Sequence, residues 1–231
     1  MLVGDILDIA SLRRSFYWPP SHHRVLRRLL ALAHGGTRVI YVPGNHDEEL
    51  RELCGAEIAG IEVRRDFIHE TADGRSFVVL HGDDFDGAVQ FRGLLINLGE
   101  QIYDAMLWPG AGVQAVRRSF GFGHWSLATW VKTRVPDARR SIERFEEAAA
   151  QAARRHGRDG VICGYIHRPG IREVEGIEYC NDGDWVEHCT ALTEDRNGRL
   201  ALVEFTGLSG GKVLAARRAW RAGIVALDPA A

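Results

Sequence analysis

Side chains that bind metal ions or transfer protons follow directly after four apolar segments of the sequence. Because the carboxyl ends of strands in an α/β sheet share one edge, we expect these groups to converge on a single crevice. Carboxylate, amide and imidazole ligands together favour Mn²⁺, Fe or Zn²⁺ over Ca²⁺. Two such ions can stabilise the attacking and the leaving oxygen of a phosphoester. The groups are Asp5 and Asp8 after 2–4, Asn45, His46 and Asp47 after 39–42, His81 and Asp83 after 77–80, and His167 after 161–163.

Each group taken alone also has an ordinary structural interpretation. A helix cap or a turn explains Asp5 and Asp8, and a buried, hydrogen-bonded histidine explains His81. The segment 44–47, Gly-Asn-His-Asp, is more specific, because a strand end, a glycine turn and three ligand-type side chains rarely coincide. The four groups together, each at the end of an apolar segment, favour a phosphoesterase-type metal site over four unrelated turns.

The four motifs resemble, in order, the blocks of the calcineurin-like metallophosphoesterases. Within that superfamily the chain is most similar to the UDP-2,3-diacylglucosamine diphosphatases of lipid A biosynthesis, and the resemblance extends to about Phe205. The segments 18–22 (Trp-Pro-Pro-Ser-His) and 179–187 (Tyr-Cys-Asn-Asp-Gly-Asp-Trp-Val-Glu) add to it. The resemblance implies a hydrolase of phosphoesters or pyrophosphates that acts on a UDP-linked diacyl-sugar. It also implies two divalent metal ions as cofactors, Mn²⁺ first, with Fe or Zn²⁺ as alternatives.

The resemblance also implies metal ligands residue by residue. Asp5 resembles the carboxylate that bridges the two ions, and Asn45 and His81 resemble ligands of the second ion. His167 resembles a ligand of the first ion. These four residues are the metal site that the resemblance predicts.

Two neighbouring residues resemble the catalytic pair of the family. His46 would lie beside the scissile phosphate, where an imidazole stabilises charge or protonates the leaving oxygen. Asp47 would orient His46 through a hydrogen bond. Asn45 would contact the substrate as well as the metal.

The chain departs from the family pattern at two places. The Asp-x-His block that supplies two ligands of the first ion is absent, and it would precede Met1 by about 30 residues. Tyr165 stands where the family has a histidine, and a phenol with a pKa near 10 is a poor ligand at neutral pH. We therefore expect incomplete metal occupancy and weak activity. Two explanations stay open: a start within a longer protein, or a degenerate relative that binds lipid or phosphate without catalysis.

The elements that position these groups follow from hydrophobic periodicity and turn residues. They predict an α/β fold, and the resemblance specifies a calcineurin-like two-sheet sandwich flanked by helices. The expected domain is 1–206, with a helical cap insertion at about 88–136 and a tail at 207–231 that carries at most one short helix. The expected helices are 21–33, capped by Ser21 and ended by Gly35, and 137–156. The expected strands are 37–42 and 160–163, with hairpins 65–70/76–80, 171–174/177–180 and 187–193/199–205.

The cap segment is basic and rich in tryptophan. Between residues 110 and 140 the only acidic residue is Asp137, against six lysines and arginines, and Trp108, Trp125 and Trp130 lie in or near it. This composition favours a membrane surface or a phosphorylated lipid as partner, although a packed cap with solvated arginines explains it too. With the resemblance, the candidate substrate contacts here are Ser126, Lys132 and Arg134.

Net charge, apolar runs and cysteine spacing limit which partners and which cellular location we expect. The net charge of −2 gives no global basic field, so we expect no nucleic-acid partner. No apolar run reaches the length of a membrane span, and no signal peptide is evident. The four cysteines contain no Cys-x-x-Cys pair. These features predict a cytoplasmic protein, with peripheral association at the inner membrane face and a phosphorylated lipid or nucleotide-sugar substrate.

Overall fold

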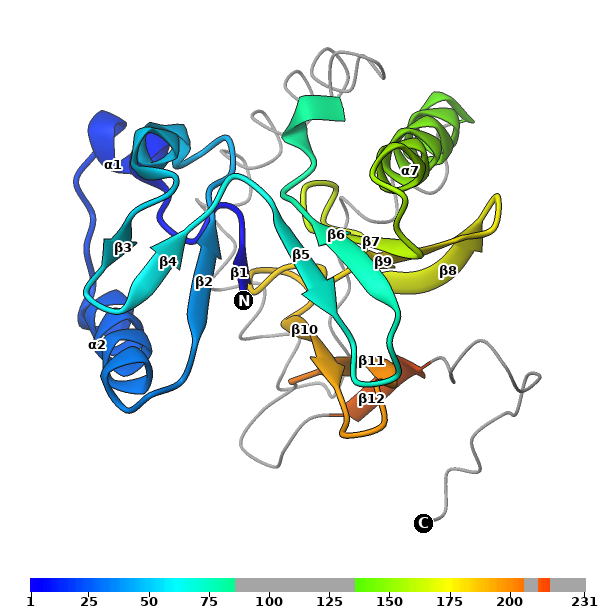
Figure 1. The fold of residues 1–231 in the computed structure, drawn as a ribbon. Helices are drawn as coiled ribbons and strands as arrows, with labels where there is room; N and C mark the ends of the chain where they lie inside the picture. The colour runs from blue at the N-terminus through cyan, green and yellow to red at the C-terminus, as the bar shows by residue number, and fades with distance from the viewer. Residues whose placement is uncertain (86–135, 206–211, 217–231) are drawn as a thin grey trace. The chain divides into compact units, whose positions relative to one another are not determined.

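The computed structural model describes residues 1–85, 136–205 and 212–216, and these residues form a mixed α/β protein (Figure 1). The chain divides into two compact units, Met1–Asp83 with Ala150–Ala231, and Asp84–Ala149. The described strands belong to three sheets. The predicted α/β class is therefore confirmed, whereas the expected number of sheets was two.

The N-terminal sheet has the strand order β1-β2-β4-β3. Strands β1, β2 and β4 are parallel, so their carboxyl ends share one edge, and β3 pairs antiparallel with β4. Two helices connect β1 to β2, as a parallel pair requires. The bounds are β1 Leu2–Val3, α1 Ile9–Arg14, α2 Pro20–His34, β2 Val39–Val42, the 3₁₀ helix η1 Glu48–Leu53, β3 Glu57–Ile58 and β4 Ile61–Val63.

Helix α2 confirms the predicted helix, but its start differs. Pro19 takes the N-cap position and Pro20 the first helical position, in place of a cap by Ser21. Proline suits the first turn because its fixed φ is helical and the missing N–H would have no partner there. Gly35 ends the helix as expected, and no α2 residue is buried.

The central sheet has the strand order β5-β6-β7-β9-β8. Its three inner strands β6, β7 and β9 are parallel, and both edge strands pair antiparallel with their neighbours. Every residue of β7 and of β9 is buried, which explains why β7 is a continuous apolar run. The two predicted hairpins are confirmed. The bounds are β5 Phe67–Glu70, β6 Ser76–Val79, β7 Gly160–Cys163, β8 Gly170–Val174 and β9 Ile177–Asn181.

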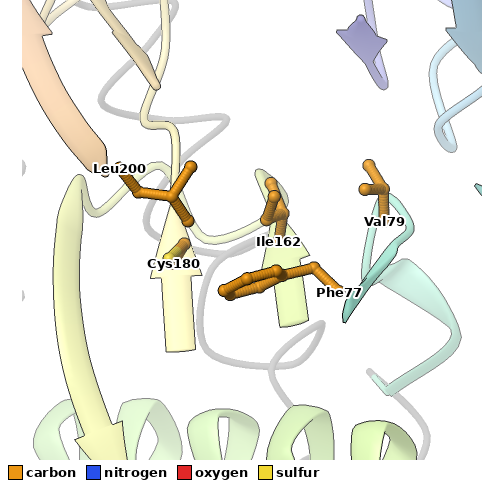
Figure 2. Close-up of a cluster of buried hydrophobic side chains, with 5 residues drawn as sticks. All are labelled: Phe77, Val79, Ile162, Cys180 and Leu200. Atoms are coloured by element: carbon orange, nitrogen blue, oxygen red, sulfur yellow. The ribbon is translucent and has the colours of Figure 1, made fainter. Parts of the chain in front are cut away.

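One row of apolar side chains crosses all five strands of the central sheet. The register pairs Phe67 with Val79, Val79 with Ile162, Ile162 with Cys180, and Cys180 with Ile171. Side chains at paired positions point to the same face, so the row forms a continuous apolar ridge. Figure 2 shows Val79, Ile162 and Cys180 of this ridge together with Phe77 and Leu200.

The same core joins the three sheets. Val3 of the N-terminal sheet and Leu192 of the C-terminal sheet pack against the cluster of Phe77, Val79, Ile162, Cys180 and Leu200. The strand ends of β1 are thereby fixed relative to those of β6 and β7, which all carry candidate site residues.

The C-terminal sheet is antiparallel, in the order β10-β11-β12. Strands β10 (Thr190–Glu194) and β11 (Leu200–Glu204) confirm the third predicted hairpin, and β12 (Lys212–Ala216) is a strand that was not predicted. Strand β12 forms because the side of β11 that does not pair with β10 has backbone N–H and C=O groups that need partners.

In the second unit the described residues are 84–85 and the part of α7 (Pro136–Arg155) before Ala150. Helix α7 confirms the predicted long helix. Within this unit Phe85 meets Phe145 edge-on at 5.7 Å between ring centroids. Apart from Pro136, the expected cap at about 88–136, with Ser126, Lys132 and Arg134, lies outside the described residues.

No helix within 1–85 or 136–216, as far as the structure describes them, is both long and apolar enough to span a membrane.

Candidate functional site

The first two motifs meet where β1 and β2 end. Gly4 N–H donates to Val42 O at 2.7 Å, which holds the chain after β1 against the end of β2. The Asp5 Oδ1 atom then accepts the backbone N–H of His46 at 2.8 Å. Asp5 adopts φ 52°, in the left-handed region that non-glycine residues seldom enter. This backbone turn directs the Asp5 carboxylate toward the motif after β2.

The third motif brings His81 to the same place. His81 Nε2 lies 3.2 Å from Asn45 Oδ1 and 3.4 Å from Asp5 Oδ2, and its side chain is 3% exposed. Gly4 makes room for the ring, because a Cβ at position 4 would lie 1.8 Å from His81 Nδ1. Three of the four predicted metal ligands therefore lie together.

Two of the spacings among these three donor atoms are those expected around one metal ion. Two ligand atoms that each lie about 2.1 Å from one ion are about 3.0–3.4 Å apart in octahedral or tetrahedral geometry. The observed separations of 3.2 and 3.4 Å fall in that range. Among histidine, cysteine, aspartate and glutamate alone, the described residues offer no group of three that could hold a metal. The third donor here is an amide oxygen, so Asp5, Asn45 and His81 together could hold one ion.

The electrostatics of Asp5 also suit a cation site. Burial raises the pKa of Asp5, but the hydrogen bond and charge of His81, and the hydrogen bond from the His46 backbone, together bring that pKa below its ordinary value. Asp5 is therefore an anion at neutral pH, and it lies within reach of two imidazoles.

The fourth predicted ligand, His167, is not part of this group of three. It follows β7 at the same sheet edge, is exposed and adopts φ 50°. The loop that carries it contacts the site through two N–H groups, those of Gly164 and Tyr165, which both donate to His81 O at 3.2 Å. The loop that carries His167 therefore contacts the candidate site through its backbone.

Tyr165 occupies the position next to His81. Its ring meets the His81 ring edge-on, with 5.4 Å between centroids and 81° between planes. Tyr165, the residue at which the motifs depart from the resemblance, therefore lies beside His81.

His46 is oriented by Asp8, which corrects the expected role of Asp47. The Asp8 Oδ1 atom lies 3.0 Å from His46 Nδ1 and also accepts the Ser11 N–H at 2.9 Å, as the N-cap of α1. Burial raises the pKa of Asp8, but the hydrogen bonds from Ser11 and His46 lower it further, to below its ordinary value. Both side chains of the pair are nearly half exposed, so His46 Nδ1 is held while the ring stays accessible.

Asp47 is fully buried and organises the backbone around it. Its oxygens accept the N–H groups of Gly44 at 2.6 Å, Ile6 at 3.1 Å and Leu7 at 3.3 Å, as well as the Tyr41 hydroxyl. Burial, together with Asp47, raises the pKa of Tyr41. A carboxylate that is 0% exposed must find hydrogen-bond donors inside the protein, and Asp47 finds them in the loops after β1 and β2. Asp47 therefore joins these two loops and does not contact His46.

Arg51 is a residue of the site region that the sequence motifs did not indicate. Its Nη2 donates to both oxygens of Asp83, at 2.8 and 2.7 Å, and lies 3.4 Å from Pro43 O. The pair joins the segment after β2 to the segment after β6, so it helps to hold Asn45 and His81 together. No motif spacing identifies it, since Arg51 lies on η1 and its partner is 32 residues away.

The segment 179–187 forms a second cluster of carboxylates after β9. Asp184 accepts the N–H groups of Val186 at 2.8 Å and of Glu187, and its other oxygen lies 2.5 Å from His188 Nδ1. Burial opposes its ionisation, but these hydrogen bonds and the charges of His188 and His167 hold the pKa of Asp184 below its ordinary value. Burial raises the pKa of the neighbouring Asp182 to about 7, and its buried Oδ1 has no hydrogen-bond partner.

Comparison of the sequence with models of protein families gave no match, and comparison with curated proteins gave no significant match.

Proposed function

We propose that this chain is a calcineurin-like, metal-dependent phosphoesterase. The observation that carries the proposal is the group of Asp5, Asn45 and His81, with donor atoms 3.2 and 3.4 Å from His81 Nε2. The three residues come from the ends of β1, β2 and β6, and the His46–Asp8 pair lies beside them. Three of the four residues that the motifs predict as metal ligands thus lie together, which supports the proposal.

The chemistry divides between the cation and the side chains. A divalent ion bound by Asp5, Asn45 and His81 would supply Lewis acidity toward a phosphoryl oxygen and an activated water. His46 protonates the leaving oxygen, or stabilises the charge on the phosphoryl group, from a ring held by Asp8. Asn45 orients the substrate through its amide. Asp47 holds the loops after β1 and β2 together, and Arg51 holds the segments after β2 and β6 together.

Metal binding is the first test of the proposal. The purified chain is stripped with a chelator and titrated with Mn²⁺, with free Mn²⁺ measured by electron paramagnetic resonance. We expect His81→Ala to weaken binding more than about tenfold, because a ligand contributes more than the outer partners of a metal site. The matched control is His69→Ala, which removes another histidine–carboxylate pair, with Glu194. Unchanged Mn²⁺ affinity in His81→Ala contradicts the assignment.

Hydrolysis is the second test. The substrate is bis(p-nitrophenyl) phosphate, with and without Mn²⁺, and we expect turnover that depends on the metal and is lost in Asp5→Asn. Turnover that survives both the chelator and Asp5→Asn would show that the activity does not come from this site.

The proposed physiological substrate is a UDP-linked diacyl-sugar. It rests on the resemblance of the motifs, including the segment 179–187. Release of UMP from such a lipid, compared with UDP-glucose as a control without acyl chains, tests this choice. Contacts by Ser126, Lys132 and Arg134, and membrane contact through the cap, remain predictions.

A second candidate function is binding of the same ligand without hydrolysis. The observation in its favour is Tyr165, which presents a phenol to His81 where a further imidazole would complete the ligand set. Binding of the UDP-linked lipid without UMP release favours this function. Hydrolysis that appears or rises strongly in Tyr165→His favours a weakened enzyme.

A further inference from the structure

Helix α2 carries unbalanced positive charge. The sequence contains no aspartate or glutamate between Ile9 and His46. Arg24, Arg27 and Arg28 are all exposed, and none of them forms an ion pair or hydrogen bond with any residue that the structure describes. Their spacing puts them within about 100° of one another around the helix axis. Helix α2 therefore presents a basic face without counter-charges.

This basic face points away from the sheet. The partly buried residues of α2 are Leu26, Leu29 and Ala33, and a Cβ at Gly60, between β3 and β4, would lie 3.3 Å from the Ala33 side chain. The spacing i, i+3, i+7 puts these three on one side of the helix. The three arginines lie on the opposite side.

Exposed aromatic side chains precede the basic face. Phe16 and Tyr17 lie in the connection between α1 and α2, and they are 81% and 71% exposed. Among the large apolar side chains that the structure describes, Phe16 is the most exposed. Neither α1 nor α2 contains a buried residue. Aromatic rings beside arginines are the combination that enters the headgroup region of a membrane.

We propose that the α1–α2 surface, defined by Phe16, Tyr17, Arg24, Arg27 and Arg28, binds membranes that contain anionic phospholipids. The arginines are attracted to lipid phosphates, and the two rings insert among the headgroups. Nucleic acid is disfavoured because single-strand binders place aromatic rings along a basic groove, whereas here both rings lie at one end of the basic face. The inference does not depend on the proposed phosphoesterase activity, although Asp8 caps α1 and so links this surface to His46.

Vesicle co-sedimentation of the full chain tests the proposal without metal or substrate. We expect binding to phosphatidylcholine vesicles that contain phosphatidylglycerol, and little binding to phosphatidylcholine alone. The triple variant R24Q/R27Q/R28Q should bind about a hundredfold more weakly, since each arginine near an anionic surface contributes about fivefold. The double variant F16A/Y17A should bind about tenfold more weakly. Raising the salt from about 0.1 M to about 1 M should release the protein, because the screening length falls from about 10 Å to about 3 Å.

The matched control is R65Q/R155Q/R196Q, which removes three exposed arginines outside this surface and changes the net charge equally. It should bind vesicles within about twofold of the parent. An equal loss of vesicle binding in both triple variants would overturn the proposal, because net charge alone would then explain the binding. Tighter binding of single-stranded DNA than of anionic vesicles would overturn it in favour of a nucleic-acid surface. Circular dichroism of each variant checks that the fold is retained.

Discussion

At the scale of single residues, His46 depends on a partner from another part of the chain. Asp8 lies 38 positions away and contacts His46 Nδ1 at 3.0 Å. We predict that Asp8→Asn lowers kcat for bis(p-nitrophenyl) phosphate by about 10–100-fold, and that His46→Ala lowers it by about 10²–10⁴-fold. The measurement is steady-state kinetics of both variants, with Mn²⁺ affinity as a second readout.

Metal affinity separates orientation of His46 from general damage to the site. Neither residue belongs to the Asp5–Asn45–His81 group, so Mn²⁺ binding should stay within about threefold of the parent value. A large loss of Mn²⁺ binding in Asp8→Asn would contradict the role given to Asp8. So would a kcat for Asp8→Asn equal to that of the parent.

Asp184 gives a prediction about stability and pH. Its folded-state pKa lies below the ordinary value, so its contribution is present above the unfolded pKa of about 3.9 and is lost as the pH falls below that. We predict that Asp184→Asn lowers the free energy of unfolding by about 2 kcal/mol at pH 7, because the charged hydrogen bonds weaken. Urea unfolding at pH 7 and near pH 3 checks this, and the difference between parent and variant should shrink at the lower pH.

The sequence indicated which residues lie close together, but it did not indicate the orientation of every side chain. The motifs correctly predicted that Asp5, Asn45 and His81 lie together. The shared edge of parallel strands explains Asp5 and Asn45, which follow the neighbours β1 and β2, but His81 follows β6 of another sheet. The choice between Asp8 and Asp47 as the partner of His46 could not be made from spacing. It depends on which way each carboxylate points in its turn, and Asp47 points inward to the amides of Gly44, Ile6 and Leu7.

At the scale of elements, the turn after β1 depends on a glycine. Gly4 has φ 75°, and any Cβ there would collide with His81 Nδ1. We predict that Gly4→Ala lowers stability by at least about 1 kcal/mol and weakens Mn²⁺ binding more than about tenfold, because His81 must move. Thermal unfolding and the Mn²⁺ titration measure the two effects.

Gly176 offers a matched comparison for Gly4. It has φ 82° in the turn between β8 and β9, and a Cβ there would meet nothing within 4 Å. Gly176→Ala should show the backbone cost alone, with metal binding unchanged. Equal effects of the two variants on Mn²⁺ affinity would show that the approach of His81 to Gly4 is not functional.

Sequence patterns predicted long or strongly apolar elements better than short ones. Strand β7 was predicted with its observed bounds, and α7 within one residue at each end. Strands β3 and β4 were missed, because they have two and three residues and pair glutamates across the ladder, Glu57 with Glu62. Strand β12 was missed because its pairing with β11 is a tertiary effect, which propensity does not contain.

At the scale of the whole molecule, one apolar core connects three sheets within the first unit. The sequence predicted the hairpin β10–β11 but not that it would form a separate sheet, since strand partners beyond a hairpin leave no local signal. Leu200 and Val3, from different sheets, nevertheless pack on the same cluster as Phe77. Unfolding of the described strands should therefore be cooperative.

Thiol reactivity gives a test of that cooperativity. Cys163 and Cys180 are buried in the inner strands β7 and β9, whereas Cys54 and Cys189 are partly exposed. We predict that a disulfide reagent modifies two thiols per folded chain quickly and the other two only as the protein unfolds. The variant Cys54→Ser/Cys189→Ser should lose the fast phase. A fast reaction of all four thiols in the parent would contradict a cooperative core.

The left-handed backbone at Asp5 and His167 places the requirements of stability and of activity in opposition. Glycine adopts φ near 50° without penalty, whereas a histidine or aspartate there costs about 1 kcal/mol. Relief of this strain favours glycine at position 167, whereas loss of the His167 charge near Asp184 opposes it. Calorimetry of His167→Gly measures which of the two effects is larger. Because the Asp5 carboxylate is one of the three candidate metal donors, selection for stability without an activity screen could remove that donor together with its backbone strain.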